Sequence, residues 1–422
     1  MKILSLAINV KDDDRRDKIT YNFILKELNW LAAAGVEVFY LSDLPEHKSE
    51  NGVMYLSKDK ILESSTFIRR ISNVMFLLRH LSFFLPMIRH SFSKTMRVCG
   101  VERACAKIIK KHKIDCIHSH FFEPFGESLV LASRRFRIPV VATLRGAELR
   151  AMPQFSYGAR LDPFYDAALR KSLPYVHFIT APSRYLCSML LELFGAQGSR
   201  IKYLPNGVEP ISCRKTLPPP QEPITFIGVA NMFPIKNFQL VFRALRHLSE
   251  RFDFQAHFVG SGVILDTFRE HLSTFKHVHV HREMPKTQLF PLMARCDFLV
   301  HPSYSEGMPN VVLEAQAMGL PCVLSDIDVH REIVIDGKNG YLFDPYKYDG
   351  FIEKMSLALS SRQMLWDMRE LCMRAASSFT LEKKMLEMME IYNALINTSY
   401  ETLCDPAAIV DGIRKEYTYA TT

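Results

Sequence analysis

The chain has 422 residues and a net charge of +8, with 48% hydrophobic and 23% charged residues. This length exceeds what one hydrophobic core normally supports, so we expect two globular domains. The balance of residue types is that of an ordinary globular protein and argues against a disordered chain. The mild positive excess fits an anionic ligand or an acidic membrane surface, and we expect no nucleic acid as a partner.

Nothing in the sequence indicates a metal, a cofactor or a membrane span. The nine cysteines form no C-x-x-C pair and no zinc-binding spacing. No segment reaches the roughly 18–20 uncharged apolar residues of a transmembrane helix. The start "MKILSLAINV" turns polar at once, so its apolar core is too short for a signal peptide. We therefore expect a cytoplasmic protein with free thiols, able to associate peripherally with the inner face of the plasma membrane.

In chain order, the first half alternates short apolar runs with helical patterns. "YNFILKELNWLAAAG" predicts a helix that ends at Gly35. Continuous apolar strands between helices predict a parallel α/β sheet. The expected strands are "KILSLAI", "VEVFYLS", "CIHSH", "VVATL", "HFITAPS" and "IKYLPNG".

Residues 61–100 interrupt this rhythm because they are both basic and apolar. Apolar residues recur at steps of three and four, which predicts an amphipathic helix. Two interpretations stay open: a helix that lies on an anionic bilayer or lines a lipid-acceptor groove, and a helical hairpin packed on its own domain. The apolar row is Phe67, Ile71, Val74, Leu78, Leu81 and Leu85, and the cations are Arg69, Arg70, Arg79, Arg89, Lys94 and Arg97 against one acid, Glu63.

The proline-rich stretch "GVEPISCRKTLPPPQEP" cannot continue a helix or a central strand. We place a linker at residues 209–223, between α/β domains at 1–208 and 224–378. A C-terminal helix and tail occupy 379–422, and that helix is expected to cross back to the first domain. The predicted fold class is α/β, with two doubly wound Rossmann-like domains that face a cleft.

The stretch at 302–326, "PSYSEGMPNVVLEAQAMGLPCVLSD", carries the most chemical information. Glu306 lies on a loop, and Glu314 lies eight positions later on a helix that begins near Pro309. The first N–H groups of such a helix form an anion site, and Gly307 lets a ligand approach the backbone closely. Glu306 is expected at the rim, where it can accept hydrogen bonds from ligand hydroxyls. Hydroxyls, a diphosphate and further hydroxyls describe a nucleotide sugar.

This stretch resembles the E-x7-E signature of retaining glycosyltransferases of the GT-B fold, family 4. The likeness extends over nearly all of residues 200–345, including "IKYLPNGVE", "ITFIGVANMFPIKNFQLVFRAL" and "HFVGSG". The resemblance implies an N-terminal acceptor-binding domain and a C-terminal nucleotide-sugar domain. It also implies a hexosyltransferase of class EC 2.4 that acts on a glycan or lipid-linked saccharide in surface polysaccharide or lipopolysaccharide biosynthesis.

Carried over residue by residue, the resemblance implies that Glu306 faces the donor sugar and Glu314 the ribose. Lys236 contacts the diphosphate and, with Glu306, is the residue implied in catalysis. Asn231 stands where an arginine is common in the family. The other implied donor contacts are Gly307, Met308, Pro309, Asn310 and Val311, and the nucleobase candidates are Glu283 and Met284.

The N-terminal half departs from the family pattern. "NVKDDDRRDKIT" has no glycine where many members have a Gly-rich turn, and "ATLRGAEL" has Arg145 where a histidine is common. An arginine there stays protonated, so it could bind an anion but could not act as a base. The acceptor candidates are Arg145, Gly146, His118 and His120.

No carboxylate is placed by the sequence as a nucleophile, which favours same-face substitution at the sugar. Three alternatives remain: a nucleotide-sugar epimerase of the same fold, a non-catalytic nucleotide-sugar-binding membrane module, and an NAD-dependent oxidoreductase. The last depends on "GSGVIL", where Leu265 replaces the third glycine of the fingerprint. The donor base and sugar, the acceptor, the linkage and the oligomeric state stay open.

Overall fold

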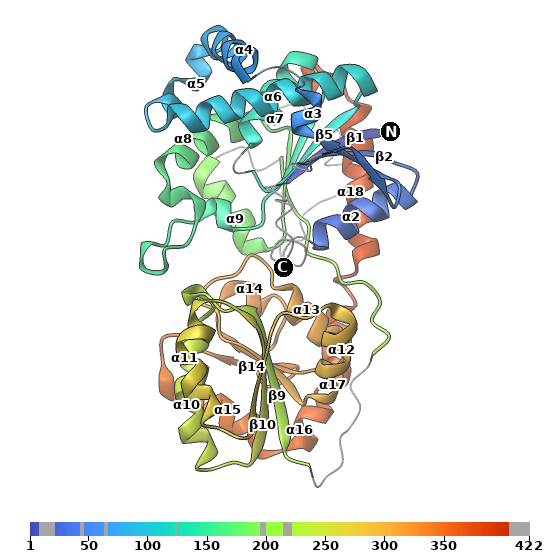
Figure 1. The fold of residues 1–422 in the computed structure, drawn as a ribbon. Helices are drawn as coiled ribbons and strands as arrows, with labels where there is room; N and C mark the ends of the chain where they lie inside the picture. Colours follow the sequence, from blue (N-terminus) through green and yellow to red (C-terminus); the bar gives the residue numbers. More distant parts are fainter. Residues whose placement is uncertain are drawn as a thin grey trace. The chain divides into compact units, whose positions relative to one another are not determined.

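A computed structural model describes residues 1–7, 22–42, 46–62, 66–122, 125–194, 200–213 and 222–404 (Figure 1). These residues form two compact units. The first unit is Met1–Leu204 with Met385–Thr422, and the second unit is Pro205–Lys384. The glycine-free stretch at 9–20, most of the predicted linker and the tail beyond residue 404 lie outside the described residues.

The first unit is built on an eight-stranded sheet in the order β3-β4-β2-β1-β5-β6-β7-β8. Its central strand, β1, is buried on both faces, so it reads as a continuous apolar run rather than an alternating one. Leu4 lies opposite Phe39 on one neighbouring strand and Ile117 on the other, both in parallel register. The strands are β1 (Lys2–Ala7), β2 (Glu37–Ser42), β3 (Lys48–Glu50), β4 (Val53–Ser57), β5 (Cys116–His120), β6 (Val140–Thr143), β7 (Phe178–Ala181) and β8 (Ile201–Tyr203).

One edge of this sheet was not predicted. β3 and β4 form an antiparallel hairpin, whereas every other strand pair of the sheet is parallel. Asn51 and Gly52 make the turn, with φ values of 51° and 78°. Asn-Gly is the dipeptide that favours such a tight turn, so the sequence did contain the signal.

Helices cover both faces of this sheet and one pair forms a further layer. α4 and α5 lie on the outer side of α6 (Figure 1). Helix α18 belongs largely to this unit, because the Tyr392 hydroxyl lies 2.6 Å from Nδ1 of His118. The helices are α2 (Asn22–Ala33), α3 (Lys58–Ile61), α4 (Thr66–Arg79), α5 (Leu81–Ile88), α6 (Phe92–His112), α7 (Gly126–Phe136), α8 (Pro163–Ser172), α9 (Arg184–Phe194), α18 (Leu381–Ile396) and α19 (Tyr400–Cys404).

The basic, apolar segment forms two helices, α4 and the short α5, followed by the start of α6, so it is broken as a helical hairpin would be and does not form one continuous helix. Leu77, Phe83, Phe84 and Met87 pack into the first unit, whereas most of the predicted apolar row is exposed. The side chain of Phe67 lies outside the described residues. In the described part of the chain no single helix meets the length and hydropathy needed to cross a membrane. Arg70–Arg79 and Leu81–Ile88 meet them only as a pair, bent by 108°.

The second unit has a six-stranded parallel sheet in the order β11-β10-β9-β12-β13-β14. Renumbered within this unit, that order is 3-2-1-4-5-6, the doubly wound arrangement. The direction of winding reverses between β9 and β12, and ligands of such sheets bind beyond the carboxyl ends of the strands at that point. The strands are β9 (Ile224–Asn231), β10 (Phe254–Ser261), β11 (Val278–His281), β12 (Phe298–His301), β13 (Cys322–Ser325) and β14 (Gly340–Phe343).

Phenylalanine rings fill the core on one face of this sheet. The rings of Phe242 and Phe258 meet edge to face at 4.8 Å, and Phe226 stacks on Phe298 at 5.3 Å. α10, α11 and α15 cover one face, and α12, α13 and α17 the other (Figure 1). The helices are α10 (Phe238–Ser249), α11 (Val263–Ser273), α12 (Lys286–Arg295), α13 (Asn310–Ala317), α14 (Asp328–Arg331), α15 (Tyr348–Ser360), α16 (Arg362–Asp367) and α17 (Arg369–Ala376).

The "GSG" turn after β10 packs directly against the end of β9. A Cβ atom at Gly260 would lie 1.9 Å from the carbonyl oxygen of Ala230, and one at Gly262 would lie 2.8 Å from the Met232 backbone. Both glycines have positive φ values. Backbone packing therefore accounts for both glycines of the turn.

We expect Gly260→Ala to destabilise the second unit by at least about 3 kcal/mol, because strain at positive φ adds to a clash with backbone that cannot move aside. Gly337→Ala is the matched control. Gly337 also has positive φ (+73°), but a Cβ there would meet nothing within 4 Å, so its cost should be about 1 kcal/mol. Urea unfolding measures both, and equal losses would contradict the packing explanation.

Candidate functional site

The predicted donor residues of the second unit gather at the carboxyl ends of neighbouring strands. Asn231 ends β9, and a short 3-10 helix at Pro234–Lys236 follows it. Glu306 follows β12, the strand next to β9 at the winding reversal. The backbone N–H of Tyr304 donates to the carbonyl of Ile235 at 2.9 Å, which holds the two loops together.

Lys236 and Glu306 form an ion pair across this reversal point. The Lys236 Nζ lies 2.6 Å from Oε1 of Glu306. The same oxygen accepts hydrogen bonds from Nε2 of His301 at 2.7 Å and from the hydroxyl of Ser303 at 2.6 Å. The carboxylate is thus held from three sides by groups on the strand end, the loop and the neighbouring 3-10 helix.

Glu306 is buried, with 7% of its surface exposed, rather than at the rim where the sequence placed it. Burial by itself raises the pKa of its carboxyl, but Lys236 and His301 outweigh burial and hold that pKa well below the usual range. Burial and the neighbouring His301 lower the pKa of His330 to about 4. The cluster at the ends of β9 and β12 therefore carries one carboxylate, one ammonium and a neutral His330.

The segment between the two glutamates leads into α13. The Asn206 amide nitrogen donates to the carbonyl of Met308 at 3.1 Å, which ties this loop to the start of the second unit. Pro309 precedes the helix, and its carbonyl accepts from the N–H groups of Val312 and Leu313. The backbone N–H groups of Asn310 and Val311 lie in the first turn of α13, where the helix has no earlier carbonyl to accept their hydrogen bonds. They therefore point out of the helix end, as an anion site requires. Gly307 is half-buried beside them.

Glu314 lies in the second turn of α13 and is 5% exposed. Its Oε1 is paired with the Lys286 ammonium at the start of α12. Its helix position agrees with the sequence prediction, whereas the lysine partner was missed. A buried carboxylate held by a lysine can accept hydrogen bonds from hydroxyl groups while it keeps its charge.

The remaining predicted donor residues lie around the end of β10. Asn231 is exposed and lies opposite Ser261 in the strand register. The Ser261 hydroxyl donates to Glu283, and Met284 follows on the same loop. The structure thus brings Asn231, Glu283 and Met284 to the same edge of the sheet as the Lys236–Glu306 pair.

The predicted acceptor residues lie in the first unit, also at strand ends. The Arg145 guanidinium donates to both carboxylate oxygens of Glu27 at 3.2 and 3.0 Å, and it lies 4.4 Å over the ring of Phe23. His120 lies beside the same carboxylate, with its Nδ1 3.6 Å from Glu27 Oε2. His118 packs on His120 with ring centroids 4.0 Å apart.

Four further contacts fix this buried cluster. The N–H groups of Arg145 and Gly146 donate to the Glu148 carboxylate, the latter at 2.9 Å. Burial raises the pKa of the Glu148 carboxyl, although these N–H bonds oppose the effect. His118 is held between the Thr143 hydroxyl at 2.8 Å and Tyr392 of α18. The four acceptor candidates therefore lie together, but the side chains of Arg145, His118 and His120 are engaged with other residues of the unit.

Sequence reasoning missed several partners in both units. Ser303 lies one residue past "HP" in a stretch that was already singled out, so its proximity to Glu306 was a detectable signal. Lys286, Glu27 and Tyr392 are distant in sequence from the groups they contact, and no local pattern identifies them. Within the described ranges, no group of three or more His, Cys, Asp or Glu residues is placed to hold a metal ion.

Comparisons with known proteins agree with this architecture. A family model described as Glycosyl transferases group 1 matches residues 212–376, and one described as Glycosyltransferase Family 4 matches residues 22–211. The teichuronic acid biosynthesis protein TuaC of Bacillus subtilis is 29% identical over 241 residues, which cover 54% of this chain and 57% of TuaC. A UDP-Gal:alpha-D-GlcNAc-diphosphoundecaprenol alpha-1,3-galactosyltransferase of Escherichia coli is 23% identical over 74% of this chain and 83% of its own length.

Solved structures show the same fold. Sucrose-phosphate synthase of Thermosynechococcus elongatus superposes with a TM-score of 0.72 at 15% identity, covering 94% of this chain and 99% of that chain. Anabaena HepE in complex with UDP-glucose superposes with a TM-score of 0.67 at 16% identity, covering 94% of this chain and all of that one. The predicted fold, two Rossmann-like domains of the GT-B type, is confirmed.

We expect Glu306→Gln to flatten the acid limb of the stability curve. The folded pKa of Glu306 is depressed, so its contribution is present above the usual glutamate pKa of about 4.3 and is lost as pH falls through the folded value. At neutral pH the variant should lose about 2 kcal/mol, between the values for buried and surface pairs. The exposed Glu353→Gln is the control, and denaturant unfolding from pH 7 to pH 3 is the measurement. Parallel curves for Glu306→Gln and wild type would show that this carboxyl is not the depressed group.

Proposed function

Because the chain is a glycosyltransferase of the GT-B fold and family 4 type, we propose that it transfers a sugar, with retention, from a nucleotide-diphosphate sugar. The acceptor in this proposal is a glycan or lipid-linked saccharide of surface polysaccharide biosynthesis. The observation that carries the proposal is the Lys236–Glu306 pair beside the open end of α13. It joins a cation, a carboxylate and unsatisfied N–H groups at the winding reversal of a doubly wound sheet.

The donor diphosphate fits the positive side of this arrangement. The Lys236 side chain is 25% exposed, so its ammonium can contact a phosphate while Glu306 orients it. The N–H groups of Asn310 and Val311 supply further donors. Asn231 contributes an uncharged amide where an arginine would contribute a positive charge. Lys236 therefore supplies most of the positive charge that compensates the negative charge of the diphosphate.

The two glutamates suit the two hydroxyl-bearing ends of the donor. Glu306 accepts from sugar hydroxyls and Glu314 from the ribose, with Lys286 holding Glu314 in place. Glu283 and Met284 flank the nucleobase. His301 and Ser303 are positioning residues in this proposal, because each hydrogen-bonds Glu306.

The reaction we propose is same-face substitution at the anomeric carbon. The bond from that carbon to the leaving phosphate oxygen breaks, and the bond to the acceptor oxygen forms on the same face. The acceptor proton passes to the leaving phosphate oxygen. Lys236 and the α13 N–H groups stabilise the charge that develops on the diphosphate. Glu306, whose Oε1 is held by two hydrogen bonds and an ion pair, orients the sugar and does not attack it.

The acceptor class rests on relatives and on the first unit. The printed name of the E. coli relative specifies a UDP-sugar donor and a diphosphoundecaprenol-linked acceptor, and TuaC is named for teichuronic acid biosynthesis. In the proposal, Arg145, Gly146, His118 and His120 shape the acceptor side. Arg145 is held by Glu27, so it contributes by fixing that wall and reaches an acceptor anion only through its remaining donors.

We expect one nucleoside diphosphate among UDP, GDP and ADP to raise the thermal unfolding temperature. At about 100 times its dissociation constant, a ligand adds roughly 2.7 kcal/mol of stability. Glu314→Ala should weaken that effect because the ribose loses its acceptor, whereas the exposed Glu353→Ala should not. Stabilisation by NAD alone, or an undiminished shift in Glu314→Ala, would contradict the donor site.

Lys236→Met should lower kcat by about 10²- to 10³-fold, because an electrostatic stabiliser of the leaving group is removed. Acceptor-dependent release of the nucleoside diphosphate is the assay, with undecaprenyl-diphosphate-linked sugar as the acceptor tested first. An epimerase would convert the donor without any acceptor, and a binding module would release no diphosphate. The exposed Lys276→Met serves as the control, and unchanged kcat in Lys236→Met would remove Lys236 from the reaction.

A further inference from the structure

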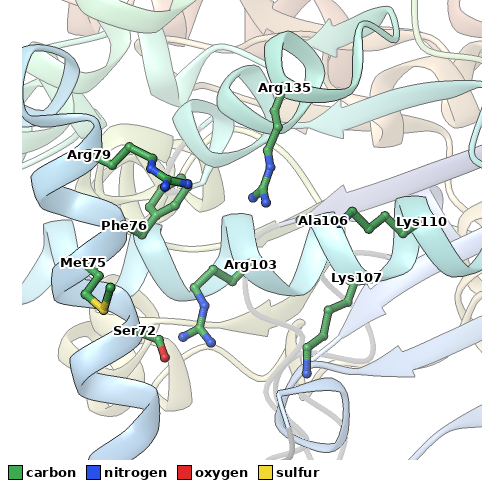
Figure 2. Close-up of a pocket in the computed structure, with 9 residues that line it drawn as sticks. All are labelled: Ser72, Met75, Phe76, Arg79, Arg103, Ala106, Lys107, Lys110 and Arg135. Atoms are coloured by element: carbon green, nitrogen blue, oxygen red, sulfur yellow. The ribbon is translucent and has the colours of Figure 1, made fainter.

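An open cavity of about 400 Å³ lies on the first unit, away from the acceptor candidates, and cations surround it (Figure 2). α4 supplies Met75, Phe76 and Arg79 to its wall, and α7 supplies Arg135. Three further cations come from α6, at positions that follow the spacing of one helix face. These are Arg103, Lys107 and Lys110.

The cavity has a strong excess of positive charge. Arg135 is paired with the buried Glu102 at 3.2 Å, and Arg103 donates to the amide oxygen of Asn73 at 2.7 Å. Lys107 donates to the carbonyl of Ile61. Among the residues that the structure describes, Arg79 and Lys110 form no ion pair with a carboxylate. Five of the nine residues that line this cavity are cationic and none of the nine is acidic, and Glu102 pairs with one of the five, Arg135.

The pKa of the neighbouring His80 responds to the same positive charges. Burial lowers the pKa of the His80 ring, and the charges of Arg135, Arg79 and Arg134 lower it further. His80 also packs against the ring of Phe76 at 4.6 Å. A cavity with this much unbalanced positive charge is suited to a phosphate-bearing ligand.

A row of exposed apolar side chains runs beside the cavity. On α4 the cavity-lining positions 72, 75, 76 and 79 are adjacent to the exposed positions 71, 74, 75 and 78. Met75 belongs to both sets and is 67% exposed, and Leu78 is 61% exposed. The row continues past the bend onto α5 with Leu81 and Leu85. Contiguous exposed apolar side chains bordered by charge mark a surface that another apolar phase covers.

The dimensions of the two helices favour a position in the membrane interface. α4 has 14 residues and α5 has eight, so each is too short to cross a bilayer. The chain bends by 108° between α4 and α5, so Leu81 and Leu85 do not lie in line with the apolar row of α4. Short amphipathic helices with basic and apolar faces lie in the headgroup region with the apolar side chains inserted.

We propose that the cavity binds the phosphate of an anionic phospholipid headgroup, with the apolar row of α4 and α5 inserted into the same bilayer. The cations alone would serve a soluble phosphate equally well. The apolar row favours a lipid phosphate over a soluble phosphate, because a soluble anion leaves these apolar side chains in water. The cavity and the apolar row share Met75 and helix α4, so one bilayer surface contacts the cavity and the row at the same time. This site is separate from the proposed donor site and needs no nucleotide sugar.

Co-sedimentation of the full chain with vesicles tests the proposal. We expect binding to equimolar phosphatidylglycerol and phosphatidylcholine at low salt, weaker binding at high salt, and none to phosphatidylcholine alone. Arg79→Glu with Lys110→Glu should lower the partition coefficient at least roughly 25-fold, at about fivefold for each cation lost. Met75→Ser with Leu78→Ser should lower it roughly tenfold or more.

Matched double variants control for charge and for surface hydrophobicity. Lys276→Glu with Lys338→Glu reverses two exposed charges of the second unit, and Leu371→Ser with Leu386→Ser removes two exposed leucines elsewhere. Both should bind as wild type, and thermal unfolding confirms that every variant is folded. Wild-type binding that neither test variant weakens, or no binding to anionic vesicles, overturns the proposal. Displacement by soluble pyrophosphate, together with full binding of the Met75→Ser, Leu78→Ser variant, would mark a site for a free anion and also overturn it.

Discussion

In the second unit, one buried carboxylate lies at the carboxyl ends of the central strands, and the structure depends on the compensation of its negative charge. A buried, unpaired carboxylate would be protonated or would destabilise the fold. Glu306 avoids both because Lys236 follows the neighbouring strand and His301 ends its own. The winding reversal between β9 and β12 brings these groups together, since loops from both strands emerge there on the same edge. The position of the site thus follows from the order of the strands in the sheet.

The first unit repeats this device with different residues. Glu27 on the helix after β1 is paired with Arg145, which follows β6, and lies beside His120 at the end of β5. Glu148 receives the backbone N–H groups of the same turn. Each sheet therefore holds a buried carboxylate near its winding reversal, balanced by a cation from a neighbouring strand end. The second unit leaves the Lys236 ammonium partly open to a ligand, whereas the Arg145 and Glu27 side chains of the first unit are both buried.

Charge is also distributed unevenly over the outside of the first unit. Five cations of α4, α6 and α7 line one cavity, next to apolar side chains that the fold leaves exposed. Neither the doubly wound core nor the buried polar cluster requires this arrangement. A transferase whose acceptor carries a lipid would work at a membrane surface, and these two features together would hold it there. The same helices also supply Leu77, Phe84 and Met87 to the core, so the exposed apolar row and the core contacts lie on different faces of these helices.

Local pattern in the sequence determined the strands, their helical connections and the stretch from Glu306 to Glu314. Each of these is written in neighbouring residues: apolar runs, a glycine after a helix, and two glutamates on a loop and the next helix. The antiparallel β3–β4 hairpin was also written locally, in Asn51-Gly52. Tertiary structure alone decided that Lys286 holds Glu314, that Glu27 holds Arg145, and that Glu306 is buried. It also decided which face of α4 meets water, because a helical apolar row has the same period whether it packs on the protein or on another phase. Those outcomes depend on contacts between residues far apart in the chain, which no local spacing encodes.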